Sequence, residues 1–163
     1  MVRENALTRT IREDSKALNL EGKSLLRVPA TVTKQTEVKV LNLSHNELTR
    51  LPTSTSNLAN LTALNLSHNK LTQFPEVVVT LINLTHLFVN DNQLSSLPAN
   101  LENLKKLEEL ELRNNKMKNL CKSIVNLNHL KKLSVADNPL VSEEITRLMV
   151  LTGSRNIFID IAG

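Results

Sequence analysis

Histidine and aspartate side chains recur at a fixed spacing in the first half of the chain, at His45, His68 and Asp91. Imidazole nitrogens and carboxylate oxygens are zinc ligands, so a fold that stacks these positions brings candidate ligands together. Zinc sites, however, use three or four ligands in a closed geometry. The two histidines also belong to one string, Ser-His-Asn, which occurs twice because the sequence repeats. We therefore predict no metal site and no cofactor.

The sequence contains none of the common catalytic motifs. It has no P-loop, no Gly-x-Ser-x-Gly and no His-Glu-x-x-His, and its three glycines cannot build a glycine-rich phosphate loop. The single cysteine, Cys121, has no candidate base beside it, which predicts a partly buried and inert thiol. We expect a protein without enzymatic activity.

Leucine and asparagine dominate the composition, with 31 and 20 residues of 163. Aromatic residues make up only 2% of the chain, and tyrosine and tryptophan are missing from it. Aromatic stacking platforms for single-stranded nucleic acids are therefore poorly supported. A bias toward two residue types is typical of a repeating architecture.

The chain repeats itself every 23 residues. One phase of asparagines is conspicuous, at Asn46, Asn69, Asn92, Asn115 and Asn138. The same step relates six leucines, Leu18, Leu41, Leu64, Leu87, Leu110 and Leu133, and four prolines, Pro29, Pro52, Pro75 and Pro98. The unit reads L-x-L-x-x-N-x-L-x-x-L-P, and six such units follow one another.

This pattern resembles the leucine-rich repeat superfamily over residues 16–155. The 23-residue length, the closing leucine-proline and the lack of cysteine-framed caps are similar to the intracellular repeats of Ras-suppressor, Scribble and Erbin proteins and of the plant intracellular Ras-group relatives. The resemblance implies an α/β solenoid shaped as a curved horseshoe, with about six parallel strands on its concave face. It also implies a protein partner, such as a small GTPase, a phosphatase or a scaffold component.

Elementary chemistry predicts the same elements. Leu41 and Leu43 alternate as strand residues do, whereas Leu101, Leu104 and Leu107 have the spacing of a short 3₁₀ or helical return on the convex face. The repeated asparagines have amides that can satisfy backbone groups inside the coil, so we interpret them as a structural ladder. Loss of one is expected to cost roughly 1 to 3 kcal/mol.

A single domain of 163 residues is expected, with both ends of the stack capped. Residues 1–15 are expected to form a helical cap that uses Ala6, Leu7 and Ile11, and residues 16–140 the repeats. Residues 141–163 are expected to form a helix from Ser142 to Gly153 and then a possible seventh strand. Phe74 occupies an inward leucine position and is predicted to be core.

The side chains that alternate with the inward leucines form the concave surface, which we call the strand face. Phe88 is predicted to be exposed there and to anchor a partner-binding patch with a charged rim. The candidate partner-binding residues are Phe88, His86, Asn65, Asn90, Glu109, Glu111 and Arg113.

Other partners and locations are less well supported by the sequence. Lys116, Lys118 and Lys122 lie among acidic residues, so neither a nucleic acid nor an anionic membrane is predicted. The longest apolar run, Leu148–Leu151, is far too short to span a bilayer, and no signal peptide is recognised. With one cysteine, these features predict a cytoplasmic monomer.

Two alternative functions are compatible with the same repeats. One is a structural subunit docked into a ciliary or cytoskeletal assembly, as the leucine-rich repeat light chain of outer-arm dynein is. The other is an extracellular receptor fragment, which predicts flanking cysteines that this sequence lacks.

Overall fold

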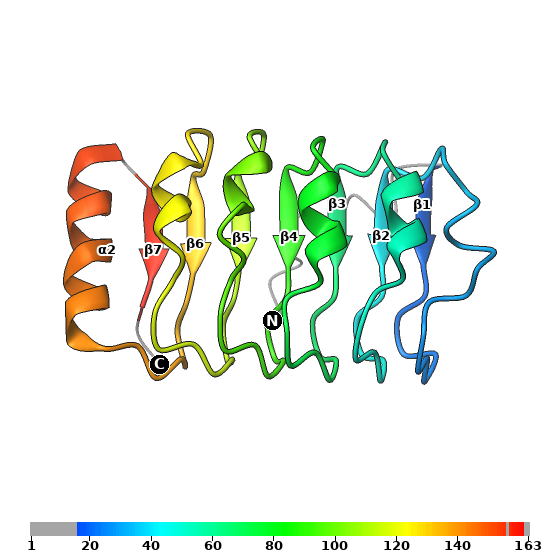
Figure 1. The fold of residues 1–163 in the computed structure, drawn as a ribbon, viewed down its shortest axis with the longest axis horizontal. Coiled ribbons are helices and arrows are strands. Elements are labelled where there is room, and N and C mark those ends of the chain that lie inside the picture. The colour runs from blue at the N-terminus through cyan, green and yellow to red at the C-terminus, as the bar shows by residue number, and fades with distance from the viewer. Residues whose placement is uncertain (1–15, 156, 162–163) are drawn as a thin grey trace, which may run out of the picture.

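The computed structural model describes residues 16–155 and 157–161. Seven short strands form one parallel sheet in which spatial order equals chain order. Figure 1 shows them standing side by side in a single row. Their bounds are β1 (Ala17–Asn19), β2 (Val40–Asn42), β3 (Ala63–Asn65), β4 (His86–Phe88), β5 (Glu109–Glu111), β6 (Lys132–Ser134) and β7 (Phe158–Asp160).

The register of the sheet follows the sequence repeat. Leu41 pairs with Leu64 and Leu64 pairs with Leu87, so each residue faces its equivalent 23 positions later. The last pairing departs from this step, because Leu133 pairs with Ile159 across an inserted helix. The solenoid and the seventh strand are therefore confirmed.

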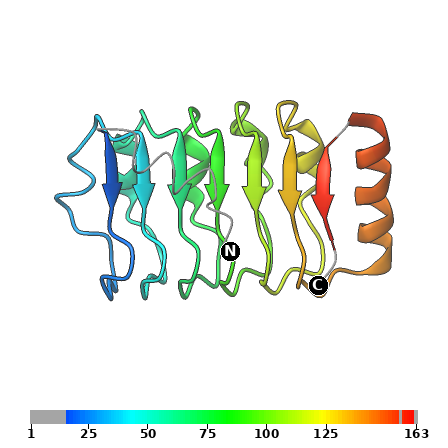
Figure 2. The same cartoon turned by 180° about the vertical axis from the view of Figure 1, so that it is seen from behind.

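Short 3₁₀ helices carry the chain back from one strand to the next. They are η1 (Thr53–Asn57), η2 (Glu76–Thr80), η3 (Leu101–Asn103) and η4 (Lys122–Asn126). Figure 1 shows these helices in front of the sheet, and Figure 2 shows the strands from the opposite side. The molecule thus has two layers, and the strand face is the sheet surface turned away from the 3₁₀ helices.

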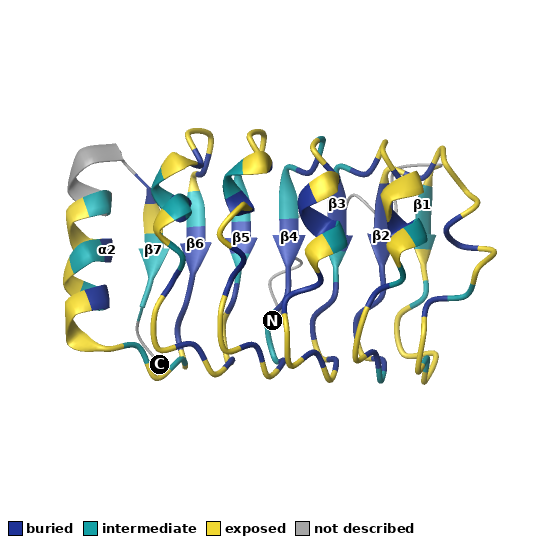
Figure 3. Ribbon diagram, in the orientation of Figure 1, coloured by how far each residue is buried: buried dark blue, intermediate teal, exposed yellow. Residues whose placement is uncertain are grey.

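The core lies between these two layers. Leucines from the strands, such as Leu41, Leu64 and Leu87, are completely buried there, together with leucines from the return segments. Figure 3 shows the buried positions running through every rung of the stack. Phe74 belongs to this core, as predicted, and is 7% exposed.

Helix α2 (Ser142–Arg155) closes the last rung and packs against β7. It begins at Ser142 as predicted, with Glu143 and Glu144 in its first turn. The prediction that Gly153 ends it is wrong, because the helix includes Gly153 and continues to Arg155. A glycine inside a helix costs only about 1 kcal/mol relative to alanine, so it does not by itself stop the helix. The expected cap over residues 1–15 lies outside the described residues.

Candidate functional site

The repeated asparagines tie neighbouring rungs together inside the coil. The Nδ2 group of Asn92 donates to the carbonyl oxygens of Leu66 at 3.0 Å and Val89 at 3.1 Å, and its Oδ1 accepts from the amide of Leu71 at 3.0 Å. Asn46, Asn69, Asn115 and Asn138 make the equivalent bonds. These side chains serve backbone groups of two rungs at once, which is a structural role.

The histidine column has a conformational explanation. His45, His68, Asp91, Asn114 and Asp137 all have φ between 50° and 56°. This left-handed conformation is uncommon for residues with a side chain, and asparagine, aspartate and histidine tolerate it best. The turn after each strand therefore favours these residue types without any metal.

Neighbouring side chains of this column also contact one another. The rings of His45 and His68 stack at 4.1 Å, and Nε2 of His68 lies 3.2 Å from Oδ2 of Asp91. Within residues 16–155 and 157–161, no three or more histidine, cysteine, aspartate or glutamate side chains are placed to hold a metal ion.

The sheet register brings the predicted partner-binding residues onto one surface. His86 pairs with Glu109, and Asn65 pairs with Phe88, which in turn pairs with Glu111. Asn90 and Arg113 follow on the same rungs, and the backbone amide of Asp91 donates to the carbonyl of Arg113 at 3.0 Å. All seven residues thus lie on or beside β3 to β5.

Phe88 is the one member that behaves differently from its prediction. It was expected to be exposed, but it is only 6% exposed and forms a second apolar cluster with Val40 and Ala63, against which Ala17 packs. The small and branched side chains of the neighbouring strands leave room for a large ring to pack across them, which removes its apolar surface from water. Phe88 therefore supports the strand face from within and is not its exposed anchor.

The charged residues of the face form a network around Lys132. Its ammonium lies 2.8 Å from Oε1 of Glu109 and 2.5 Å from Oε1 of Glu111. Both carboxylate side chains are about 15% exposed, so this network is partly desolvated. Burial opposes the charged form of Lys132, but its hydrogen bonds to the two carboxylates prevail and raise the pKa of Lys132.

Within this network, Glu111 has a surrounding that disfavours the charged form of its carboxyl group. Burial raises the pKa of the Glu111 carboxyl above its ordinary value near 4.5, and the hydrogen bond and positive charge of Lys132 offset this only in part. The neighbouring Glu109 raises the pKa further, because two carboxylates share one ammonium.

Glutamine at position 111 should remove a pH dependence of stability. Because folding raises the pKa of Glu111, the folded state binds more protons than the unfolded state between pH 4.5 and the raised value. We expect the free energy of unfolding of the wild type, relative to that of Glu111→Gln, to fall as the pH rises through this window. Urea titrations at a series of pH values measure it, and a difference that grows with pH contradicts the assignment.

The remaining predicted residues make local contacts. His86 Nε2 lies 3.8 Å from Oε2 of Glu109, and Arg113 Nε donates to Oδ2 of Asp137 at 2.6 Å. Asn65 Oδ1 accepts from the amide of Ser67 at 2.9 Å. Two buried oxygens of this face, Ser67 Oγ and Asn90 Oδ1, have no hydrogen-bond partner.

Sequence reasoning missed three residues of this surface. Lys132 belongs to the network; the 23-residue step places it in the same strand-face column as Glu109, but it was not among the candidate partner-binding residues. Phe158 and Asp160 continue the strand face onto β7, where Phe158 pairs with Lys132 and Asp160 with Ser134. The alternation in the string NIFIDI predicted the strand, but the 26-residue offset across α2 concealed which residues share a column.

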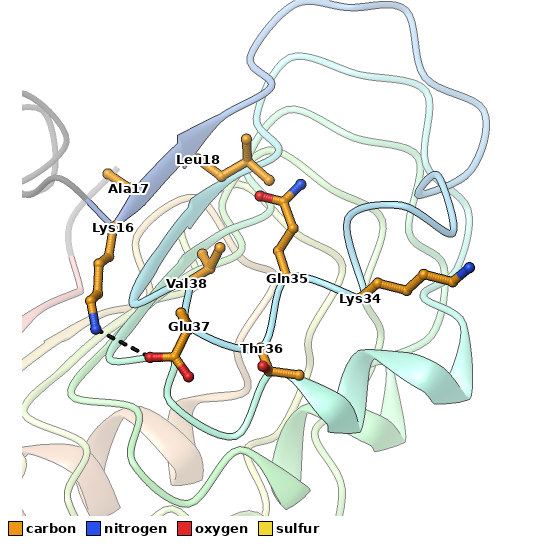
Figure 4. A pocket seen from close by; sticks show the side chains of 8 residues that line it. All are labelled: Lys16, Ala17, Leu18, Lys34, Gln35, Thr36, Glu37 and Val38. Carbon is orange, nitrogen blue, oxygen red and sulfur yellow. Dashed lines mark hydrogen bonds and ion pairs between the residues drawn. The ribbon is translucent and has the colours of Figure 1, made fainter.

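A pocket of about 410 Å³ lies at the opposite end of the stack, beside β1. Figure 4 shows its lining side chains from residues 16–18 and 34–38, with Lys16 paired to Glu37 at 3.2 Å. This pocket contains no histidine, cysteine or serine, so it offers no usual nucleophile and base pair. Cys121 lies elsewhere, half-buried at the start of η4, where its sulfur accepts from the hydroxyl of Ser123 at 3.3 Å.

The only α-helix of the described residues, α2, contains 14 residues. No helix in this part of the chain has the length and apolar character needed to cross a bilayer.

Known proteins share this architecture. Residues 17–149 match a family model described as a leucine-rich repeat region. The chain is similar to the structure of internalin C2 from Listeria monocytogenes, with 27% identity and a TM-score of 0.74 over 89% of this chain and 60% of the internalin. No curated protein matches it.

Two further structures are also similar. The TLR13–ssRNA13 complex gives 26% identity and a TM-score of 0.75 over 91% of this chain and 22% of that chain. The leucine-rich repeat ectodomain of the receptor kinase SOBIR1 from Arabidopsis thaliana gives 28% identity and a TM-score of 0.61, covering 77% of this chain and 70% of that one. From its repeats, its asparagine bonds and these matches, the chain belongs to the leucine-rich repeat family.

Proposed function

We propose that this protein is a non-catalytic interaction module that binds a protein partner on the strand face over β3 to β6. The observation that carries the proposal is the network of Glu109, Glu111 and Lys132, with His86 beside it. Charged side chains on the outward surface of a sheet do not contribute to the packing of the hydrophobic core. Charged groups at an interface commonly determine which partner binds and in which orientation. The equivalent positions on β1 to β3 are small and neutral.

The sequence features suggest which class of module this is. The 23-residue unit with leucine-proline and a single cysteine resembles the intracellular Ras-suppressor, Scribble and Erbin group. By that analogy we propose a monomeric cytoplasmic adaptor whose partner is a small GTPase, a phosphatase or a scaffold component.

A protein partner is favoured over a nucleic acid. One similar structure, that of TLR13, is a complex with single-stranded RNA. Phosphate groups need cations on the surface that binds them, whereas the strand face of β5 presents Glu109 and Glu111. We therefore propose that no nucleic acid binds there.

Charge reversal tests this proposal. We expect Glu109→Lys combined with Glu111→Lys to abolish capture of the partner from a lysate of cells that express the protein, because three lysines then repel one another and any basic partner group. The readout is mass spectrometry of proteins captured by the wild type and lost with the variant.

The control is Glu76→Lys on η2, which makes the same type of substitution at one exposed residue on the opposite layer. Circular dichroism must show that both variants fold. If the wild type and the strand-face variant capture the same proteins, the partner does not bind at Glu109 and Glu111, and the proposed site is wrong.

A further inference from the structure

The acidic network continues beyond β5 onto the last strand. Asp160 on β7 lies on the strand face, and its Oδ2 accepts from the hydroxyl of Ser134 at 3.2 Å. Among the residues that the structure describes, no lysine or arginine forms an ion pair with Asp160. Glu109 and Glu111 share the ammonium of Lys132, and Asp160 adds a third carboxylate to this surface.

This acidic patch, which consists of Glu109, Glu111, Lys132 and Asp160, carries a formal charge of −2. The whole chain carries +4, so the patch has the opposite sign to the molecule. The nearby Arg113 forms its ion pair with Asp137 at 2.6 Å and none with Asp160, although the hydrogen bond and charge of Asp137 and, to a smaller extent, the charge of Asp160 raise the pKa of Arg113.

The sheet register places one carboxylate on each side of Ser134. Glu111 and Asp160 pair with Ser134 from either side. Neighbouring strands are about 4.8 Å apart, so a positive group above Ser134 has one carboxylate on each flank. Ser134 itself is buried and contributes only a small hydroxyl there.

An exposed aromatic ring stands next to this place. Phe158 is 63% exposed on β7, two residues before Asp160 and on the same face. A planar guanidinium can stack on an aromatic ring and donate to a carboxylate at the same time, which an ammonium does less well. Phe158 thus takes the anchoring role that the sequence assigned to Phe88.

We propose that the strand face of β5 to β7 binds an arginine-containing basic segment of the protein partner, with one guanidinium between Glu111 and Asp160 and against Phe158. This inference rests on the proposed function and specifies the chemistry of the partner. The occupant is a basic segment because the patch holds uncompensated negative charge, and the exposed ring beside it accounts for the choice of arginine.

Synthetic peptides test the proposal directly. The probes are three fluorescein-labelled peptides of equal length with alternating charged and leucine residues, in which the charged residue is arginine, lysine or glutamate. Fluorescence anisotropy at physiological ionic strength measures their binding to the full chain. We expect the arginine peptide to bind most tightly, the lysine peptide about tenfold more weakly, and the glutamate peptide not at all.

Variants locate the binding. Phe158→Ala and Asp160→Asn should each weaken binding of the arginine peptide about tenfold. Glu76→Gln on the opposite layer should leave it within twofold, which controls for the change in total charge. Urea denaturation should show that all three variants keep the wild-type midpoint, because each altered side chain is at least partly exposed.

Three results overturn the inference. The first is equal binding of the arginine and glutamate peptides, and the second is wild-type affinity of Phe158→Ala and Asp160→Asn for the arginine peptide. The third is self-association of the chain that Phe158→Ala abolishes, because the occupant of the surface is then a second copy of the chain. If the arginine peptide fails while Glu109→Lys with Glu111→Lys still loses its captured partner, the inference falls and the proposed function stands. If the peptide binds as expected but capture does not change, the proposed function falls instead.

Discussion

Alanine at position 92 is expected to lower the free energy of unfolding by about 3 kcal/mol. The Asn92 amide donates to the carbonyls of Leu66 and Val89 and accepts from the amide of Leu71, all of them buried. Alanine leaves the buried amide of Leu71 without its side-chain partner, whereas the carbonyls of Leu66 and Val89 each lose one bond and keep another, from Asn69 and Asn115. One unsatisfied buried group costs about 1 to 3 kcal/mol, and the two lost bonds add to it, which places the total at the upper end of the range expected from sequence.

Urea denaturation followed by circular dichroism measures this loss. The matched control is Asn103→Ala, because Asn103 is exposed on η3 and its side chain makes no hydrogen bond within the described residues. The control should change stability by no more than about 0.5 kcal/mol. Similar losses for the two variants contradict a ladder role for Asn92.

Alanine at position 88 is expected to destabilise the protein by about 3 kcal/mol. Phe88 is 6% exposed and packs with Val40 and Ala63, so removing the ring uncovers apolar surface and leaves a void on the strand face. The value lies at the lower end for phenylalanine in a core, because this second cluster is small.

The companion variant is Phe158→Ala, which removes the same ring from a position that is 63% exposed. Its unfolding free energy should stay within about 0.5 kcal/mol of the wild type. Urea denaturation of both variants under the same conditions provides the comparison. If Phe88→Ala retains wild-type stability and Phe158→Ala does not, the roles assigned to the two rings are reversed.

Most of the architecture was predictable from sequence. The 23-residue step sets which residues pair across the sheet, as Leu41 with Leu64 shows, and the leucine alternation sets which side of each strand faces the core. These features are local and repeated, so every rung specifies the same geometry. The prediction for Gly153 was wrong, because the end of a helix also depends on how that helix packs.

The candidate site was predictable only as a surface. Alternation assigns His86, Phe88, Glu109 and Glu111 to the strand face, and the register places them together. The alternation does not reveal whether an aromatic side chain on that face is exposed to solvent. Phe88 is buried because its ring packs against the apolar side chains of Val40 and Ala63, which lie 48 and 25 residues earlier in the sequence.

By itself, the sequence determined the first six rungs, their parallel pairing and the positions of the ladder asparagines, because each follows from a strict repeat. Only the tertiary structure decided how Lys132 is shared by Glu109 and Glu111, and that Phe158 and Asp160 extend the strand face. The physical reason is that the repeat ends at α2. Beyond it the register depends on how the helix packs against the last rung, and the exposure of each side chain depends on neighbours that no periodicity specifies.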